Sequence, residues 1–200
     1  MENPLLELQE YENLLEALKK AKGPLQAAGT LESQKVHLMH ELGEDGGFPW
    51  KLVVTYDEQR AKEIYDDFRS FTKQVWLYPA KDLLFYAADI HGNLMTRQRI
   101  CVLRHLMEDE GGVVVTTVDG LMDHLMPLAF LKQNAVTVEC GQVIDLNEWK
   151  ERLTELGYER MGQVDGMGQF SIRGGIIDIF PLTEEVPVRI ELWDDEVDSI

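Results

Sequence analysis

The sequence predicts an α/β protein: a doubly wound parallel-sheet domain followed by a smaller α+β domain that is mostly antiparallel. Apolar strands alternate with amphipathic helices as far as Pro127, which is typical of a parallel sheet covered on both faces. Beyond residue 158, apolar and polar residues alternate with period two between glycines and prolines, as in antiparallel strands joined by turns. The pattern changes between Pro127 and Gln133, so we expect domains at residues 1–127 and 128–200.

The first domain is predicted from alternating helical and strand periodicity. Leucines three and four residues apart between Leu5 and Leu18 predict an amphipathic helix that ends at Gly23-Pro24. The later elements are expected to be a strand at 25–28, a helix at 33–42, a loop at 43–49, a strand at 51–56, a helix at 58–71, a strand at 74–78, a helix at 91–110, a strand at 113–117 and a short helix at 119–126. Most aromatic residues fall on the apolar faces of these elements, so we expect Tyr56, Tyr65, Phe68, Phe71, Trp76 and Tyr78 in the core.

The second domain is predicted to hold one principal helix and several strands. We expect a strand at 135–140, a helix at 147–156 with Asn147 as its N-cap, and strands at 169–173, 176–180 and 186–193. The acidic run that begins at Asp194 predicts a charged turn, because it lacks the glycine and the spacing of a calcium-binding loop. The chain stops at Ile200 inside this pattern, and we therefore expect a piece of a longer protein.

Composition favours a soluble cytoplasmic module. The 200 residues can bury a sizeable core, and no apolar run approaches the roughly 20 residues that span a bilayer. Cys101 and Cys140 are far apart and are expected to be buried free thiols. The 19 Lys and Arg against 36 Asp and Glu give a net charge of −17. This balance disfavours direct DNA binding, which draws on cations that neutralise phosphates, unless the chain carries a local basic patch.

A degenerate phosphate-binding loop begins at Gly29, with the sequence Gly-Thr-Leu-Glu-Ser-Gln-Lys-Val. The first glycine and Lys35 match the pattern G-x-x-x-x-G-K-[ST]. Gln34 replaces the second glycine, Val36 replaces the hydroxyl that holds magnesium, and Glu32 adds a negative charge. We therefore expect no functional ATP site; a chance match of glycine and lysine at this spacing is the alternative. Lys35 and the following helix N-terminus leave nucleotide or phosphate binding as a second hypothesis.

No metal site or catalytic residue is predicted. His37 and His40 lie three apart with Glu41 beside them, but no third and fourth ligand follows them. His91, His105 and His124 are isolated in the sequence and are expected to be structural or exposed. No nucleophile–base motif appears, so no cofactor and no enzymatic activity are expected of this chain itself.

The C-terminal segment contains an ordered set of motifs. They are Tyr158-x-Arg160, Gly168-x-Phe170-x-x-Arg173-Gly174, Asp178-Ile-Phe-Pro181, Arg189-Ile-Glu-Leu192 and Asp195-Glu-Val-Asp-Ser-Ile200. Together they resemble the UvrB-homology region of the bacterial transcription-repair coupling factors (Mfd). That family consists of ATP-dependent DNA translocases, which remove stalled RNA polymerase and recruit the excision-repair protein UvrA. The resemblance implies that polymerase, DNA and ATP are handled by other parts of the parent protein. It also implies a UvrB scaffold without a damage probe, because residues 79–96 are too short for one.

The resemblance further implies that UvrA is the direct partner, with Arg160 and Arg173 as its anchors. UvrB carries a third arginine where this chain has Ser171, so fewer contacts are expected. A planar guanidinium can pair with a carboxylate through two hydrogen bonds, which lysine cannot do. The alternative for both arginines is an ion pair inside the domain, with Glu159, Asp165 or Asp178 as the candidate acids. Phe170 and Phe180, which lie near by, are expected to be core residues.

Overall fold

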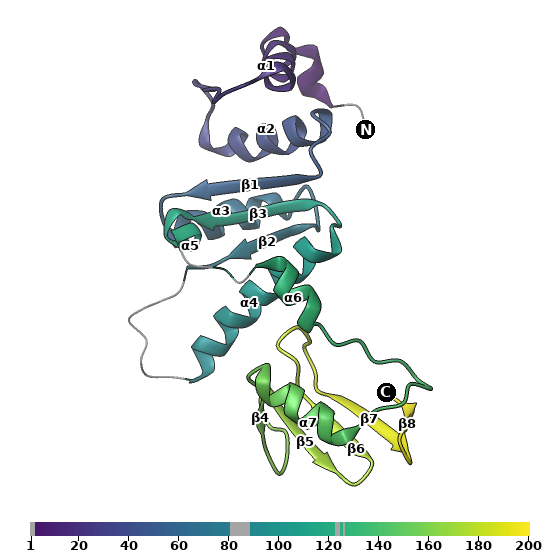
Figure 1. The fold of residues 1–200 in the computed structure, drawn as a ribbon. Coiled ribbons are helices and arrows are strands. Elements are labelled where there is room, and N and C mark those ends of the chain that lie inside the picture. Colours follow the sequence, from purple (N-terminus) through teal and green to yellow (C-terminus); the bar gives the residue numbers. More distant parts are fainter. Residues whose placement is uncertain (1–2, 81–88, 123–124, 126) are drawn as a thin grey trace. The chain divides into compact units, whose positions relative to one another are not determined.

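The computed structural model describes residues 3–80, 89–122, 125 and 127–200. Contacts among its residues divide the chain into two compact units: residues 1–82 with 104–124, and residues 83–103 with 125–200. The first unit contains a parallel sheet with flanking helices, and the second a mixed, mostly antiparallel sheet (Figure 1). This arrangement confirms the predicted fold class.

The first unit is built on three parallel strands in the order β1-β3-β2. They are β1 (Trp50–Thr55), β2 (Val75–Tyr78) and β3 (Gly112–Thr117). β3 is buried at every position, as its run of three valines and two threonines requires of a central strand. Its first residue, Gly112, has a φ of +144°, and an added Cβ would lie 2.7 Å from the Gln74 carbonyl oxygen. Glycine is therefore the residue that lets β3 pass this close to its neighbour.

Helices supply the other half of this core. The helical elements of the unit are η1 (Pro4–Glu7), α1 (Gln9–Lys20), α2 (Glu32–Asp45), α3 (Glu58–Phe68) and α5 (Val118–Met122), together with the last turn of α4 (Asp89–Glu108). Val36 of α2 packs with Phe68 of α3 against Val113 and Val115 of β3. α3 begins at Asp57, whose carboxylate accepts the Arg60 backbone N–H at 2.7 Å, which satisfies one free donor of its first turn.

Three predictions for this unit are wrong. Residues 25–28 form no strand: they are exposed and pair with none of the three strands of the sheet. α2 continues to Asp45, so the expected loop at 43–49 begins only at Gly46. Tyr56 and Phe71, expected in the core, are exposed. The end of the expected helix at 119–126 lies partly outside the described residues. Residues 81–88 also lie outside them; they belong to the segment that was expected to be too short for a damage probe.

The second unit is a five-stranded sheet in the order β4-β5-β6-β7-β8. β4 (Glu159–Arg160) pairs parallel with β5 (Gln169–Arg173); β6 (Ile176–Ile179), β7 (Val188–Trp193) and β8 (Glu196–Ser199) continue antiparallel. Helices α6 (Leu128–Asn134) and α7 (Leu146–Glu155) precede the sheet along the chain. The residues 89–103 of α4 also belong to this unit.

α7 packs on one face of this sheet. Leu153 contacts Phe170 and Ile179, and Trp149 lies against the same cluster. A neighbouring cluster joins Ile177 and Ile190 across β6 and β7. Because side chains of a strand alternate between faces, burying these residues directs their neighbours to the opposite face. The period-two pattern of the sequence thus fixes the face of the sheet on which each side chain lies.

Several predictions for this unit need correction. Residues 135–140, which follow α6, form no strand because they do not pair with any strand of the sheet. The acidic run begins as the predicted turn, but Glu196 already belongs to β8, whose Val197 is buried in the core. Cys140 is exposed and Cys101 only half-buried, so the expected burial of both thiols is wrong. In the described part of the chain, no helix has the length and apolarity needed to cross a membrane.

The N-cap of α7 is Asp145 and not Asn147, because the Asp145 carboxylate accepts the backbone N–H groups of Asn147 at 2.7 Å and Glu148 at 3.2 Å. We predict that Asp145→Ala lowers the free energy of unfolding by about 1 kcal/mol, whereas Asn147→Ala changes it by a few tenths. Denaturant unfolding of both variants measures the difference. An equal effect of the two substitutions would contradict the cap.

Candidate partner-binding surface

An ion cluster of three side chains lies on the sheet face opposite α7. Arg173 Nη2 donates to Asp178 Oδ2 at 2.8 Å. Arg189 donates to the same carboxylate through Nε at 2.7 Å and Nη2 at 3.1 Å. The Asp178 side chain is only 13% exposed, while those of Arg173 and Arg189 are 56% and 55% exposed. The acid therefore lies beneath two cations that face the solvent.

Strand register assembles this cluster from three strands. Asp178 of β6 lies opposite Ser171 of β5 on one side and opposite Arg189 of β7 on the other. Arg173 is two residues along β5 from Ser171 and so points to the same face. The alternative considered for Arg173, an ion pair with Asp178, is what the structure contains. The sharing of that acid with Arg189 was not predicted, and only the register reveals it.

The two arginines stabilise the charged form of Asp178. The hydrogen bonds from Arg189 are the largest cause, followed by that from Arg173, and together they hold the pKa of Asp178 below its usual value although burial opposes the shift. The same contact raises the pKa of Arg189. The cluster is thus charged at neutral pH.

Arg160 lies elsewhere on the sheet. It is an exposed residue of β4, the edge strand, and pairs in register with Phe170. Residues opposite each other in a parallel pair point to the same face, so Arg160 belongs to the face of Phe170 and Arg173 to the other. Within the described ranges, its side chain forms no hydrogen bond or ion pair, so it pairs with neither Glu159 nor Asp165. The two predicted anchors therefore flank the β4 edge from opposite sides.

Other residues near the anchors have clear structural roles. Phe170 is fully buried, as predicted, and Phe180 is half-buried. Ser171 is buried, and its hydroxyl donates to the Gly162 carbonyl oxygen at 3.2 Å. An arginine at position 171 would have to displace the Gly162 segment. The small serine therefore allows this segment to pack over β5.

Sequence reasoning missed one surface residue. Trp193, at the end of β7, is 81% exposed and lies on the same face as Arg189 by strand alternation. Its position in the alternating run 186–193, in step with Arg189 and Glu191, could have identified it as outward-facing. Large exposed aromatic side chains are enriched at protein interfaces.

The segment with the degenerate loop pattern, which begins at Gly29, leads into the first turn of α2. Gly29 has a φ of +87°, yet no strand precedes it between residue 3, where the described chain begins, and this glycine. Lys35 forms an ion pair with Glu32, which also contacts Arg60. Gln34 is exposed, and Val36, which stands where the magnesium-binding hydroxyl would be, is buried against α3 and β3. Lys35, the only lysine of the loop, is thus paired with Glu32, three residues before it.

Comparisons with known proteins agree with the C-terminal pattern. Residues 136–200 match the family model described as the UvrB interaction domain. The chain is 38% identical over 151 residues to the transcription-repair-coupling factor of Bacillus subtilis, and 33% and 35% identical over the same length to those of Staphylococcus aureus and Staphylococcus epidermidis. Each match covers 74% of this chain and 13% of the relative. The chain therefore spans a small part of the length of these relatives.

The ion cluster generates a prediction for stability against pH. The folded-state pKa of Asp178 is lowered, so its contribution is present above the unfolded pKa of about 3.9 and is lost as pH falls through the folded value. We predict that Asp178→Asn lowers the free energy of unfolding by about 1–2 kcal/mol at pH 7. The difference from the unsubstituted chain should stay constant above about pH 5 and shrink below about pH 4.

Urea unfolding from pH 2.5 to pH 8 measures this difference. The matched control is Asp165→Asn, which changes an exposed acid of the same unit and should show no comparable dependence. A difference that remains constant down to pH 2.5 would rule out the paired carboxylate.

Proposed function

This chain is homologous to a region of the transcription-repair-coupling factors (Mfd) that includes the UvrB interaction domain, and from that premise we propose that it recruits the excision-repair protein UvrA. The match of residues 136–200 to the interaction domain is the observation that carries the proposal. In this role the chain is a cytoplasmic adaptor that brings UvrA to stalled RNA polymerase. The translocase activity and the contacts with polymerase and DNA belong, in this proposal, to other parts of the parent protein.

We assign the UvrA contact to the β4 side of the second unit, with Arg160 and Arg173 as anchors. Arg160 supports this assignment because it is exposed on an edge strand. An edge strand presents backbone groups as well as side chains to a partner. Since the two arginines flank this edge from opposite faces, a partner that contacts both has to extend around β4. Residues 128–200 are, in this proposal, the UvrA-binding domain.

The ion pair of Arg173 does not remove it from this role. A guanidinium carries five N–H donors, and Asp178 accepts a single hydrogen bond from Arg173. The remaining donors are available to a carboxylate of the partner, and the pair with Asp178 restrains the side chain before binding. Restraint of this kind reduces the entropy lost on association. An acidic patch on the partner is the expected complement.

We also propose that this chain does not hydrolyse ATP. The ion pair between Lys35 and Glu32 supports this, because the lysine that would contact the phosphates already has an acidic neighbour. The burial of Val36 supports it further, since no magnesium ligand is presented at that position. The competing function, binding of a nucleotide or another phosphate, would require Lys35 to leave Glu32.

We predict that Arg173→Ala and Arg160→Ala each weaken UvrA binding by about 30-fold or more, which corresponds to about 2 kcal/mol. Calorimetric titration of the 200-residue chain with UvrA gives the affinities, and melting curves report folding. The matched control for Arg173 is Arg189→Ala, because both side chains bind Asp178 and are exposed to the same extent. The control for Arg160 is Lys150→Ala, an exposed cation of α7.

Arg189→Ala should lower the melting temperature at least as much as Arg173→Ala, because Arg189 donates two hydrogen bonds to Asp178 and Arg173 one, while leaving affinity within about twofold. Equal losses of affinity in the two variants would show that the cluster matters as a whole and that Arg173 is not an anchor. Unchanged affinity in the double variant Arg160→Ala/Arg173→Ala would refute the assignment altogether.

For ATP, we predict no saturable binding at millimolar nucleotide and magnesium in calorimetry of the same chain. Lys35→Ala should leave this result unchanged, because the lysine is held by Glu32. Micromolar affinity that Lys35→Ala abolishes would establish nucleotide binding in place of the proposal. Glu32→Gln is a useful companion variant, since it frees Lys35 without restoring the missing glycine.

A further inference from the structure

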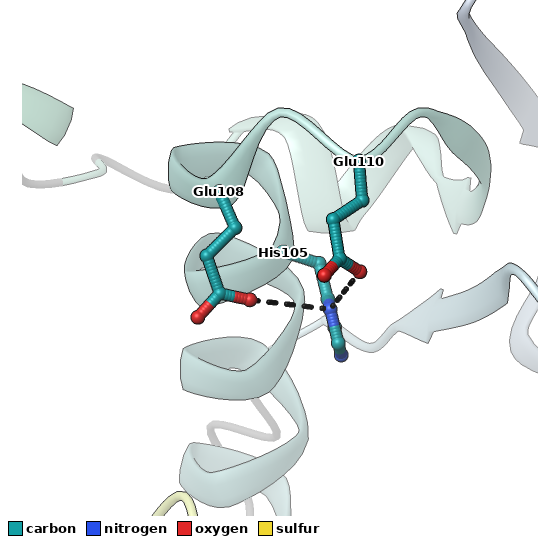
Figure 2. Close-up of side chains that lie close together, drawn as sticks. All are labelled: His105, Glu108 and Glu110. Carbon is teal, nitrogen blue, oxygen red and sulfur yellow. Dashed lines mark ion pairs between the residues drawn. The ribbon is translucent and has the colours of Figure 1, made fainter.

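Three side chains converge at the C-terminal end of α4, within the first unit. Figure 2 shows His105 and Glu108 on the last turns of the helix and Glu110 on the segment that follows. His105 Nδ1 lies 3.4 Å from Glu110 Oε2 and 3.8 Å from Glu108 Oε2. The three candidate ligand atoms all lie within 4.8 Å of one another. His105, which was expected to be isolated, is therefore at the centre of a cluster. The other two histidines expected to be isolated fall outside the description: the side chain of His91 and the whole of His124 are not among the described parts.

The local backbone brings Glu110 back toward the helix. Asp109 adopts a left-handed conformation with a φ of 55°, and its N–H donates to the His105 carbonyl oxygen at 3.1 Å. Its carboxylate accepts the Trp50 indole N–H at 3.0 Å. Gly111 follows with a φ of +75°, where an added Cβ would lie 2.9 Å from the Pro49 carbonyl oxygen. The turn that positions Glu110 is thus fixed at several points.

The imidazole is also held in place. The His105 ring stacks on Trp76 with centroids 4.4 Å apart, and Trp76 lies 5.7 Å from Trp50. Glu108 is oriented by Arg104, whose Nε donates to the other carboxylate oxygen, Oε1, at 2.8 Å. Restraint of a ligand by a second contact of this kind is typical of metal sites.

The nitrogen that faces the carboxylates is unsatisfied. His105 Nδ1 is shielded from solvent, and among the described residues no hydrogen-bond partner is found for it. Both distances to the carboxylates exceed the 2.7–3.2 Å range usual for an N–H···O hydrogen bond. A single N–H on this nitrogen could serve only one of the two acids, and two neighbouring carboxylates repel each other. A cation between the three atoms would satisfy all of them.

The spacing suits a small divalent ion. Ligand atoms at about 2.0–2.2 Å from a tetrahedral zinc ion lie about 3.3–3.6 Å apart, and the two observed distances from Nδ1 are 3.4 and 3.8 Å. Imidazole and carboxylate are both ligands of zinc-class metals. We propose that His105, Glu108 and Glu110 form a binding site for a divalent transition-metal ion of the zinc class.

Solvent can complete the coordination. Glu110 lines a pocket of about 500 Å³, together with Glu44 and Lys51, at the end of the sheet where the strands begin. Three protein ligands leave at least one position for water in a four-coordinate site. Because Glu110 lines the pocket, water can reach its carboxylate from there.

Tryptophan fluorescence can detect metal binding at this site. Ni²⁺ and Cu²⁺ quench indole fluorescence at short range, and Trp76 contacts the ring that would bind them. Titration of the 200-residue chain with Ni²⁺ should quench part of the emission saturably, and Zn²⁺ should reverse it by competition. Calorimetry with Zn²⁺ alone should give one site. Trp76→Phe, which keeps an aromatic ring against the imidazole, should remove most of the quenching.

Two variants and a matched control decide the outcome. His105→Gln and Glu110→Gln should each weaken Zn²⁺ binding by tenfold or more; Glu110 is exposed, so its substitution should leave folding intact. His40→Gln is the control, because His40 Nδ1 also lacks a partner in the described chain but is not part of a three-ligand group there; it should bind as the unsubstituted chain does. Absence of a saturable site at up to about 100 µM Zn²⁺ would overturn the proposal. So would binding that survives both variants, or that depends on Cys101 and Cys140 in Ser variants.

Discussion

The alternation of side chains along β5, β6 and β7 is the constraint on which the proposed partner surface depends. Phe170, Ile177 and Ile190 must lie beneath α7 to form a core, and a shift of register by one residue would exchange the two faces. Burying them fixes Asp178 and its two arginines on the face opposite α7. The charges are therefore placed by the hydrophobic core, and the ion pairs then restrain side chains whose direction was already decided.

The same reasoning accounts for the residues that occupy the positions of the degenerate loop pattern in the first unit. Val36 is needed by the core that α2, α3 and β3 share, and a buried position cannot present a hydroxyl to magnesium. Glu32 lies in the first turn of α2, where an acid favourably faces the helix dipole, and there it pairs with Lys35 and Arg60. Val36 and Glu32 thus contribute to the packing and the ion pairs of the unit.

Sequence patterns predicted those elements that bury a periodic face, and failed where a single tertiary contact decides the structure. Helix α3 and strands β3, β5 and β6 follow from periodicity, and the ion pair of Arg173 with Asp178 was among the alternatives considered. The apolar residues at 25–28 had no signal to show that no strand would pair with them. Local patterns do not encode strand register, which places Arg189 beside Asp178 and puts the two anchors on opposite faces. Nor do they encode the left-handed conformation of Asp109, which brings Glu110 close to His105.

Hydrogen–deuterium exchange of the chain with and without UvrA tests the central claim, that the partner contacts the β4 side of the second unit, most directly. Peptides that cover residues 157–163 and 169–175 should exchange more slowly in the complex, because a partner that reaches both arginines has to cover this edge. Peptides from α3 and from the segment around Lys35 should exchange at unchanged rates. Protection confined to the first unit, with the β4 and β5 peptides unaffected, would contradict the account.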